Sequence, residues 1–314
     1  MKILFVTCKA ADYISSVLWD GLCEVLGPQN VYDAIHSPQL HPVKGEDSNR
    51  DPNTAVGRHP GAIANYLRDE NGFEIMVMNA AFFREGSMGQ AERFRALCRQ
   101  DAAMIYVNGD DGTDWGVTPP WPIDAFFRRE MVPGFPYPGN THPITMAAPR
   151  RWFVEMPVER DIDFLHAGWY MAHPARWQIA QKMFSTQRRH HSLCATQSII
   201  PYSYWFSMLR RTKFCICPPG AGSDCLRQWE ALACGAIPIF VDHPDRLGDL
   251  HPQGTFTIKD VDELPALMDT LMDRVLGYDM TGDRRAMWEN ALAKHTTAAR
   301  ARQVLRSVNA YVPV

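Results

Sequence analysis

The most informative stretch of the sequence, residues 213–243, reads KFCICPPGAGSDCLRQWEALACGAIPIFVDH. It begins with a short apolar run typical of a buried strand, passes through a turn with two glycines, and then shows helical spacing that ends at Gly235. A second apolar run follows at once. This order predicts a strand, a helix and a parallel strand, with Ser223 or Asp224 as the N-cap of the helix.

Strands and helices alternate on both sides of this stretch. Apolar runs typical of strands open the chain and recur at residues 74–79, 102–109 and 161–168, and segments with helical spacing separate them. Such alternation is typical of parallel sheets wound by helices. Between Gly112 and Pro149 it gives way to a segment rich in proline, glycine and aromatic residues, which indicates loops at the end of a domain.

The length of the chain favours two domains, each with a core of its own. Its 314 residues divide into an N-terminal domain over 1–155 and a C-terminal domain over 156–314. The last helical stretch, over 283–308, has no strand after it, so we expect it to pack at the domain junction. The predicted fold class is α/β, with two Rossmann-like, doubly wound parallel-sheet domains.

Composition excludes several classes of protein. The hydrophobic fraction of 46% and the charged fraction of 21% are ordinary for a globular chain and give no sign of disorder. The net charge of −3 does not indicate a nucleic acid or an anionic membrane as partner. No segment approaches the roughly 20 apolar residues that a transmembrane helix needs, and the N-terminus lacks a signal-peptide pattern. We therefore expect a cytoplasmic protein without membrane insertion. Its eight cysteines lie in apolar surroundings, where we expect reduced thiols and no metal site.

The glycine-rich turn carries the chemistry of the second half. Gly220 and Gly222 bring the N-terminus of the next helix to the carboxyl edge of the sheet, where free N–H groups and the helix dipole suit a diphosphate. Arg227 and Glu230 are three residues apart and share a helix face, so a guanidinium for phosphate oxygens lies beside a carboxylate for ribose hydroxyls. The alternative is a surface ion pair beside a tight turn.

This window also resembles the donor-site motif of exostosin-like glycosyltransferases and related bacterial GT-B enzymes. The resemblance rests on the pattern of Phe, Pro, Gly, Arg and Glu followed by Ala-Leu and a Gly-x-Ile-Pro strand. DIDFLHAG at 161–168, followed by Arg176, is similar to the start of the C-terminal domain in those enzymes, and the N-terminal half is only weakly similar. The resemblance implies a GT-B fold with two domains facing a cleft. It also implies metal-independent transfer from a nucleoside diphosphate sugar, which we expect to be a UDP sugar used as substrate, with no cofactor.

The resemblance also implies which residues contact the donor. The matching positions are Gly220, Gly222, Ser223, Arg227 and Glu230. We add Asp224 at the helix start and His166 in FLHAG, where a backbone or imidazole donor can meet the sugar diphosphate; a core histidine is the alternative there. The sequence is short and shows no membrane anchor, so the polysaccharide acceptors of eukaryotic exostosins are not carried over.

Acidic residues follow the predicted strand at 102–109. Asp110, Asp111 and Asp114 lie where a carboxylate can take the proton of an acceptor hydroxyl, as an inverting transfer requires; retention and inversion both stay open. Their spacing does not match the metal-binding DxD motif, so we expect no metal ion. Asp12, after the first strand, is a further candidate base, and His59 is a candidate for the edge of the substrate site. A structural role is the alternative for each.

These features predict a hexosyl- or pentosyltransferase that acts on a hydroxyl of a saccharide, a small molecule or a modified nucleobase. One alternative is transfer to hydroxymethylated pyrimidine in phage-type DNA, with the aromatic segment Trp115–Tyr137 and the cations Arg128 and Arg129 as the candidate surface. A nucleotide-binding oxidoreductase is a second alternative, although the GxGxxG spacing is missing. A binding module that keeps the donor cleft without turnover is the third.

Overall fold

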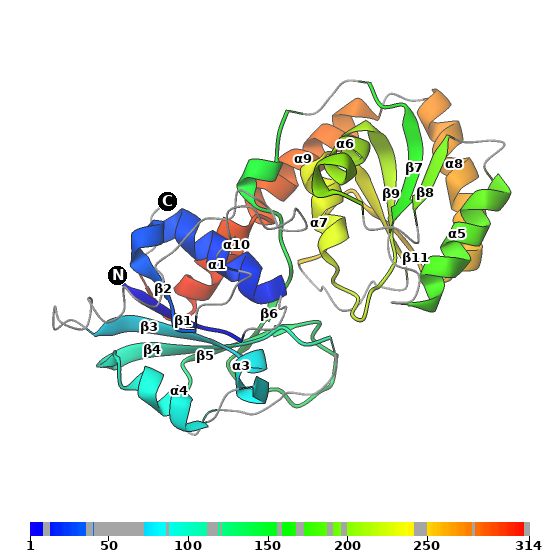
Figure 1. Cartoon of the computed structure of the whole chain (residues 1–314). Coiled ribbons are helices and arrows are strands. Elements are labelled where there is room, and N and C mark those ends of the chain that lie inside the picture. Colours follow the sequence, from blue (N-terminus) through cyan, green and yellow to red (C-terminus); the bar gives the residue numbers. More distant parts are fainter. Residues whose placement is uncertain are drawn as a thin grey trace. The chain divides into compact units, whose positions relative to one another are not determined.

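The computed structural model describes residues 1–8, 13–35, 40, 72–85, 88–111, 119, 121–155, 159–167, 173–186, 191–195, 200–241, 250–277 and 280–310. The chain forms two compact units (Figure 1). The first unit comprises Met1–Pro149 together with Thr297–Val314, and the second comprises Arg150–Thr296. Each unit is built around its own parallel sheet.

The sheet of the first unit has six strands in the order β2-β1-β3-β4-β5-β6. Every neighbouring pair is parallel. The strands are β1 (Ile3–Val6), β2 (Val31–Asp33), β3 (Phe73–Asn79), β4 (Cys98–Asn108), β5 (Ala125–Arg129) and β6 (Thr141–Ile144). Apolar runs such as ILFV are buried along their whole length, as expected for strands that are covered on both faces.

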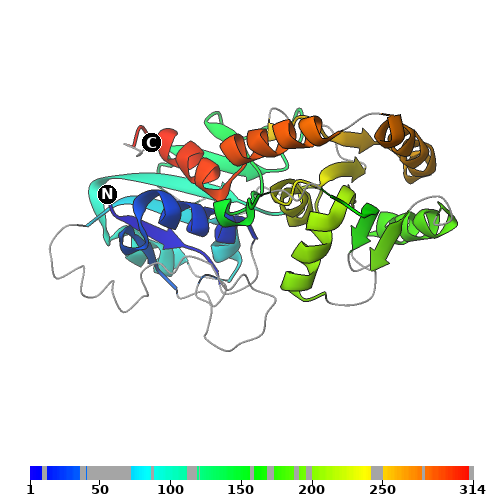
Figure 2. The ribbon, with the colours of Figure 1, turned by 90° about the horizontal axis from the view of Figure 1, so that it is seen from above.

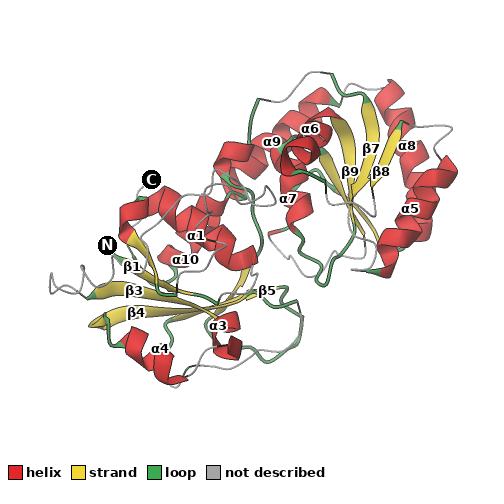
Figure 3. Ribbon diagram, in the orientation of Figure 1, coloured by secondary structure: helices red, strands yellow, loops and turns green. Residues whose placement is uncertain are grey.

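Helices cover both faces of this sheet (Figure 3). On one face lie α1 (Tyr13–Leu26), followed by the short η1 (Pro28–Asn30), and α10 (Thr297–Arg306); on the other lie α3 (Ala80–Glu85) and α4 (Met88–Arg95). The segment 62–69, for which the spacing of apolar residues predicts a helix, lies outside the described residues. Phe82 of α3 and Ala91 of α4 pack with Met76, Tyr106 and Phe126 of the strands in one buried cluster. The predicted alternation in this half is therefore confirmed for the strands and helices that the structure describes.

The last helix of the chain packs against the first one. Figures 1 and 2 show α10 (red) beside α1 (blue). Thr297 Oγ1 donates a hydrogen bond of 2.7 Å to Asp20 Oδ2, and a Cβ on Gly21 would lie 2.1 Å from the carbonyl oxygen of Thr297. Residues 297–314 thus belong to the first unit, whereas the predicted domain ranges place them in the second. The predicted helix over 283–308 is in fact two helices, with the break at His295 and Thr296.

The sheet of the second unit has five parallel strands in the order β11-β10-β9-β7-β8. These are β7 (Ile162–Ala167), β8 (Ser192–Ala195), β9 (Thr212–Cys217), β10 (Ile237–Val241) and β11 (Phe256–Ile258). The helices are η2 (Arg150–Trp152), α5 (Pro174–Thr186), α6 (Tyr202–Arg211), α7 (Leu226–Ala233), η5 (Val261–Glu263), α8 (Leu264–Gly277) and α9 (Thr281–Lys294). Figure 3 shows α5 and α8 on one face of the sheet and α6, α7 and α9 on the other.

Both units have the doubly wound arrangement that the sequence predicts. In the second unit, β7 is followed by β8 on one side and by β9 on the other, so the order of strands reverses between β7 and β9. In open sheets of this kind, ligands bind at the carboxyl ends of the strands where the order reverses. None of the helices that the structure describes is both long and apolar enough to cross a membrane.

Candidate functional site

The reversal point of the second sheet brings three predicted site segments together. His166 lies near the carboxyl end of β7, and the neighbouring β9 leads into the glycine-rich turn and then into α7. Arg176, in the first turn of α5, reaches the same turn, since its Nε donates a hydrogen bond of 3.0 Å to the carbonyl oxygen of Pro219. His166, Arg176 and the glycine-rich turn thus lie at one edge of one sheet.

The turn is held by contacts within it. The N–H of Gly220 donates to the carbonyl oxygen of Gly222 at 2.7 Å. A Cβ on Gly220 would lie 3.0 Å from Cys225 Sγ and 3.1 Å from Arg176 Nη2, so these neighbours would have to give way by a few tenths of an ångström. Glycine at this position lets the arginine lie against the turn.

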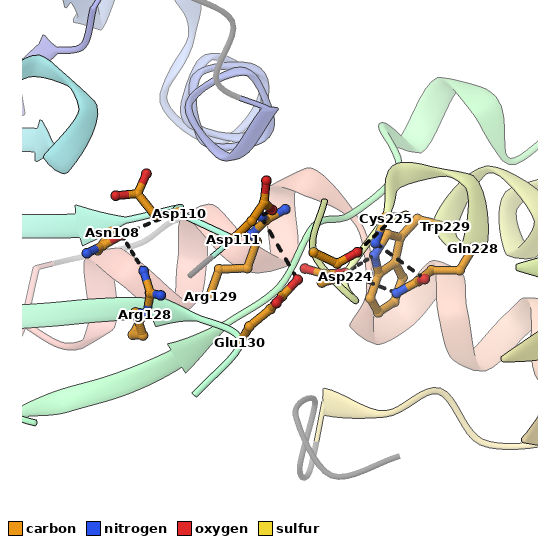
Figure 4. Close-up of polar contacts among 11 residues, drawn as sticks. Asn108, Asp110, Asp111, Arg128, Arg129, Glu130, Asp224, Cys225, Gln228 and Trp229 are labelled. Atoms are coloured by element: carbon orange, nitrogen blue, oxygen red, sulfur yellow. Dashed lines mark hydrogen bonds and ion pairs between the residues drawn. The ribbon is translucent and has the colours of Figure 1, made fainter. Parts of the chain in front are cut away.

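The N-cap of α7 is Cys225, not Ser223 or Asp224 as predicted. Its backbone N–H donates to Gln228 Oε1 at 3.4 Å, and its side chain completes the capping box. Asp224 is almost fully buried and uses Oδ1 to accept hydrogen bonds from Gln228 Nε2 and Trp229 Nε1, at 3.1 and 2.8 Å (Figure 4). The carboxylate therefore fixes the first turn of the helix from the inside, because it finds buried donors there.

Two guanidinium groups lie close together at the start of α7. Burial, and then the positive charge of Arg227, lowers the pKa of Arg176 below its ordinary value. Arg227 is half-buried, and its Nη1 is shielded from water without a hydrogen-bond partner among the described residues. Together with the N-terminus of α7 these groups form a cationic, partly desolvated site, which is suited to an anion with several oxygens.

His166 is fully buried beside this cationic site. Burial, followed by the positive charges of Arg227 and Arg176, lowers the pKa of its imidazole to about 3, so the ring is neutral at neutral pH. Its Nδ1 lies 3.5 Å from the carbonyl oxygen of Ile216, which favours the proton on Nδ1. Nε2 has no partner among the described residues. With the proton on Nδ1, Nε2 is left as a hydrogen-bond acceptor.

Glu230 does not lie on an exposed helix face. Only 6% of it is exposed, and its two carboxylate oxygens accept hydrogen bonds from Tyr202 Oη at 2.6 Å and Trp205 Nε1 at 2.7 Å, both on α6. Burial raises the pKa of the carboxyl group above its usual value, although these two hydrogen bonds act in the opposite direction. The expectation of an open carboxylate was wrong because α6 packs over this side of α7.

The predicted acidic cluster of the first unit follows β4 (Figure 4). Asp110 is half-buried, and its backbone N–H donates to Asn108 Oδ1 at 3.0 Å. Asp111 is exposed and forms an ion pair with Arg129 of β5. Asp12, Asp114 and His59 lie outside the described residues. The carboxylate of Asp111 is thus engaged by a buried arginine of the neighbouring strand.

Sequence reasoning missed the polar end of β5. Arg128 is fully buried, and its Nη1 donates to Asn108 Oδ1. Glu130 is also buried, has a positive φ of 57°, and lies 4.0 Å from Arg129 Nη2. The segment was interpreted as loop because prolines surround it. The run AFFRRE was the available signal, since buried aromatic residues followed by charges are typical of a strand that ends at a site.

The comparisons with known proteins agree with this architecture. No family model and no curated protein matches the sequence. Among solved structures, an alpha-glucosyltransferase in complex with UDP and a 13-mer DNA matches with a TM-score of 0.56 and 9% identity, over 96% of this chain and 97% of that one. A glycosyltransferase from Rickettsia africae gives a TM-score of 0.58 at 8% identity, over 98% of both chains. HepE of Anabaena, in complex with UDP and glucose, gives 0.53 at 10% identity, over 98% of this chain and 99% of that one.

These similarities establish the fold. The chain has the two-domain GT-B fold of glycosyltransferases, with parallel sheets of six and five strands. The likeness to exostosin-like enzymes in particular remains a resemblance of one sequence window, because no family model matches.

Proposed function

We propose that this protein transfers a sugar from a nucleoside diphosphate sugar to a hydroxyl acceptor, and that the donor is a UDP sugar. One observation carries the proposal. A desolvated guanidinium atom, Arg227 Nη1, has no partner among the described residues and lies at the glycine-turn helix start where the order of strands reverses. A diphosphate supplies the missing acceptors at this place. The UDP complexes of two structural neighbours support the choice of nucleotide.

In this proposal the second unit holds the leaving group. Arg227 and Arg176 pair with diphosphate oxygens, and the N-terminus of α7 faces the same charge. These groups are positioned before the reaction begins, so they stabilise the negative charge that develops on the departing diphosphate. Transfer is therefore expected not to require a metal ion. His166, as a neutral acceptor at Nε2, is suited to a hydroxyl group of the donor.

The acceptor is assigned to the first unit, with Asp110 as the base of an inverting reaction. Asp110 follows β4 at the carboxyl edge of the sheet, and the ion pair with Arg129 makes Asp111 the weaker candidate. An acceptor in duplex DNA is not favoured. The cations predicted for a DNA surface, Arg128 and Arg129, are only 0% and 4% exposed, so they offer no open surface to the backbone of a DNA duplex.

The test is release of UDP from UDP sugars in the presence of a panel of saccharide acceptors. Asp110→Asn should reduce turnover by a factor on the order of 10² to 10⁴, because general-base catalysis contributes about that much, while UDP affinity stays unchanged. Asp101→Asn, which changes an exposed carboxylate on the strand that leads to Asp110, is the matched control. Activity should survive EDTA. Absence of turnover with every UDP sugar would overturn the proposal, and loss in EDTA with recovery in Mn²⁺ would overturn the metal independence.

A further inference from the structure

Arg128 is a buried cation that the proposed reaction leaves unexplained. It is the fourth residue of β5, and its side chain is 0% exposed. Nη1 donates to the neutral side chain of Asn108, whereas Nε and Nη2 are buried without a hydrogen-bond partner among the described residues. A buried guanidinium without a counter-charge is costly by several kcal/mol, so it is retained only where it has a use.

The neighbouring acids do not neutralise it. Asp111 and Glu130 lie beside Arg129, the next residue of the chain. Successive side chains of a strand point to opposite faces of the sheet, so Arg128 shares its face with Phe126, and Arg129 lies on the other. In the part of the chain that the structure describes, Arg128 therefore has no carboxylate partner.

The two free atoms form the edge of the guanidinium that binds oxyanions. Nε and Nη2 donate in parallel and match the two oxygens of a carboxylate or phosphate. The chain shows this geometry elsewhere, since Nε and Nη2 of Arg211 hold the two carboxylate oxygens of Asp161. In Arg128 the same two donors have no hydrogen-bond partner among the described residues. Asn108 fixes the orientation of the guanidinium by accepting a hydrogen bond from Nη1.

We propose that Arg128 binds the carboxylate or phosphate group of an anionic acceptor. This inference rests on the proposed function, because it names the class of acceptor for the same reaction. Asn108 Oδ1 accepts hydrogen bonds from both Arg128 and the backbone N–H of Asp110, so the anion site and the proposed base are joined through one amide oxygen (Figure 4). Because the guanidinium is closed off from bulk water, its neighbours must open to admit the ligand. The site therefore suits a compact anion on a small acceptor rather than a polymer backbone.

The direct measurement is the Nε–H resonance of Arg128 in ¹⁵N NMR, assigned by its loss in Arg128→Met. The protein is saturated with UDP, so that the donor site is occupied, and then titrated with glucuronate, glucose 6-phosphate or neutral glucose at constant ionic strength. Glucuronate should shift the resonance if the ligand group is a carboxylate, and glucose 6-phosphate if it is a phosphate. Neutral glucose should leave the resonance unchanged. Arg128→Lys keeps the charge but loses the parallel donors, and should weaken binding of the active probe by about tenfold.

Stability gives a second, independent readout. Arg128→Met removes an unpaired buried charge, so its melting temperature should be higher than that of the unmodified chain, and neither anion should raise it further. An Arg128 resonance that both anions leave unchanged would overturn the inference, as would a lower melting temperature for Arg128→Met. Failure of UDP to bind overturns the proposed function instead, and the same titration without UDP then still shows whether Arg128 binds anions.

Discussion

Glu230 shows how one residue can match a motif and yet take part in other contacts. Its spacing from Arg227 suggests a ribose ligand, but its oxygens already accept hydrogen bonds from Tyr202 and Trp205. The carboxylate of Asp224 likewise accepts hydrogen bonds from the side chains of Gln228 and Trp229. Sequence spacing shows which residues share a helix face, whereas it cannot show which other helix packs over that face.

Glu230→Ala should therefore destabilise the second unit rather than affect donor binding alone. The substitution removes the acceptor of the Tyr202 hydroxyl and of the Trp205 indole N–H, at a cost of about 1–3 kcal/mol for the buried indole and less for the partly buried hydroxyl. Urea denaturation measures the loss, and Glu230→Gln should lose less because it keeps an acceptor oxygen. If Glu230→Ala were as stable as the unmodified chain but no longer bound UDP, the ribose contact expected from the sequence would be correct.

His166 should make the stability of the protein sensitive to acid. The unfolded chain takes up a proton below a pKa of about 6.5, whereas the folded imidazole does so only near 3. Between these values the unfolded state binds more protons, so stability is fully present above 6.5 and falls as the pH decreases, by at most about 1.4 kcal/mol per pH unit. The raised pKa of Glu230 acts in the opposite direction at pH values just above the usual pKa of the carboxyl group, where the folded state binds more protons than the unfolded chain.

Urea denaturation at several pH values between 4 and 7 tests this, with His166→Asn for comparison. The variant should lose stability less steeply with falling pH, whatever its stability at pH 7. If the free energy of unfolding fell equally with pH in the two proteins, the folded imidazole would take up its proton at the same pH as in the unfolded chain, and its lowered pKa would be contradicted.

At the scale of elements, the glycine turn after β9 depends on close contact with Arg176. Gly220→Ala places a methyl group 3.0 Å from Cys225 Sγ and 3.1 Å from Arg176 Nη2, so the arginine or the turn must shift. UDP affinity should fall by about tenfold, or about 1.4 kcal/mol. Gly282→Ala is the control, because its added methyl group meets no atom within 4 Å. Calorimetry that finds equal UDP affinity in both variants would show that this contact does not form the donor site.

The predicted strands and helices agree with the structure where the apolar pattern is strong, and the prediction fails where proline is frequent. The strand, turn and helix at residues 213–233 are observed, with the N-cap shifted to Cys225. The strands β5 and β6 were missed, because the prolines around them indicate loops and both strands are short. Arg128 was therefore predicted only as part of a DNA surface, since its place at a strand end becomes visible only when the strand is known.

At the scale of the whole molecule, the chain begins and ends in the same unit. The place of α10 in the first unit depends on its close packing on α1, where Gly21 lies against the backbone of Thr297. A helical pattern in the sequence gives no information on which domain the helix joins, because that is decided by such steric fits. The domain assignment of residues 297–314 was therefore beyond sequence reasoning.

Gly21→Ala should loosen this packing. Its methyl group would overlap the carbonyl oxygen of Thr297, so the two helices must separate, at a cost of about 1–3 kcal/mol. Hydrogen exchange should become faster in α1 and α10 and stay unchanged in α7. Gly89→Ala, which meets no atom within 4 Å, controls for the change of residue type. Unchanged exchange in Gly21→Ala would show that α10 is not held by this contact.

In the function that we propose, the second unit binds a nucleoside diphosphate through the glycine turn and its two arginines. Titration calorimetry with UDP tests it most directly, with uridine and NAD as comparison ligands and with Arg227→Met set against Arg211→Met, which removes only an exposed ion pair. We predict that UDP binds and that uridine binds at least about tenfold more weakly. Arg227→Met should lower the affinity for UDP by a similar factor, whereas Arg211→Met should leave it unchanged. Binding of NAD without binding of UDP, or equal UDP affinity in Arg227→Met and the unmodified chain, would contradict the account.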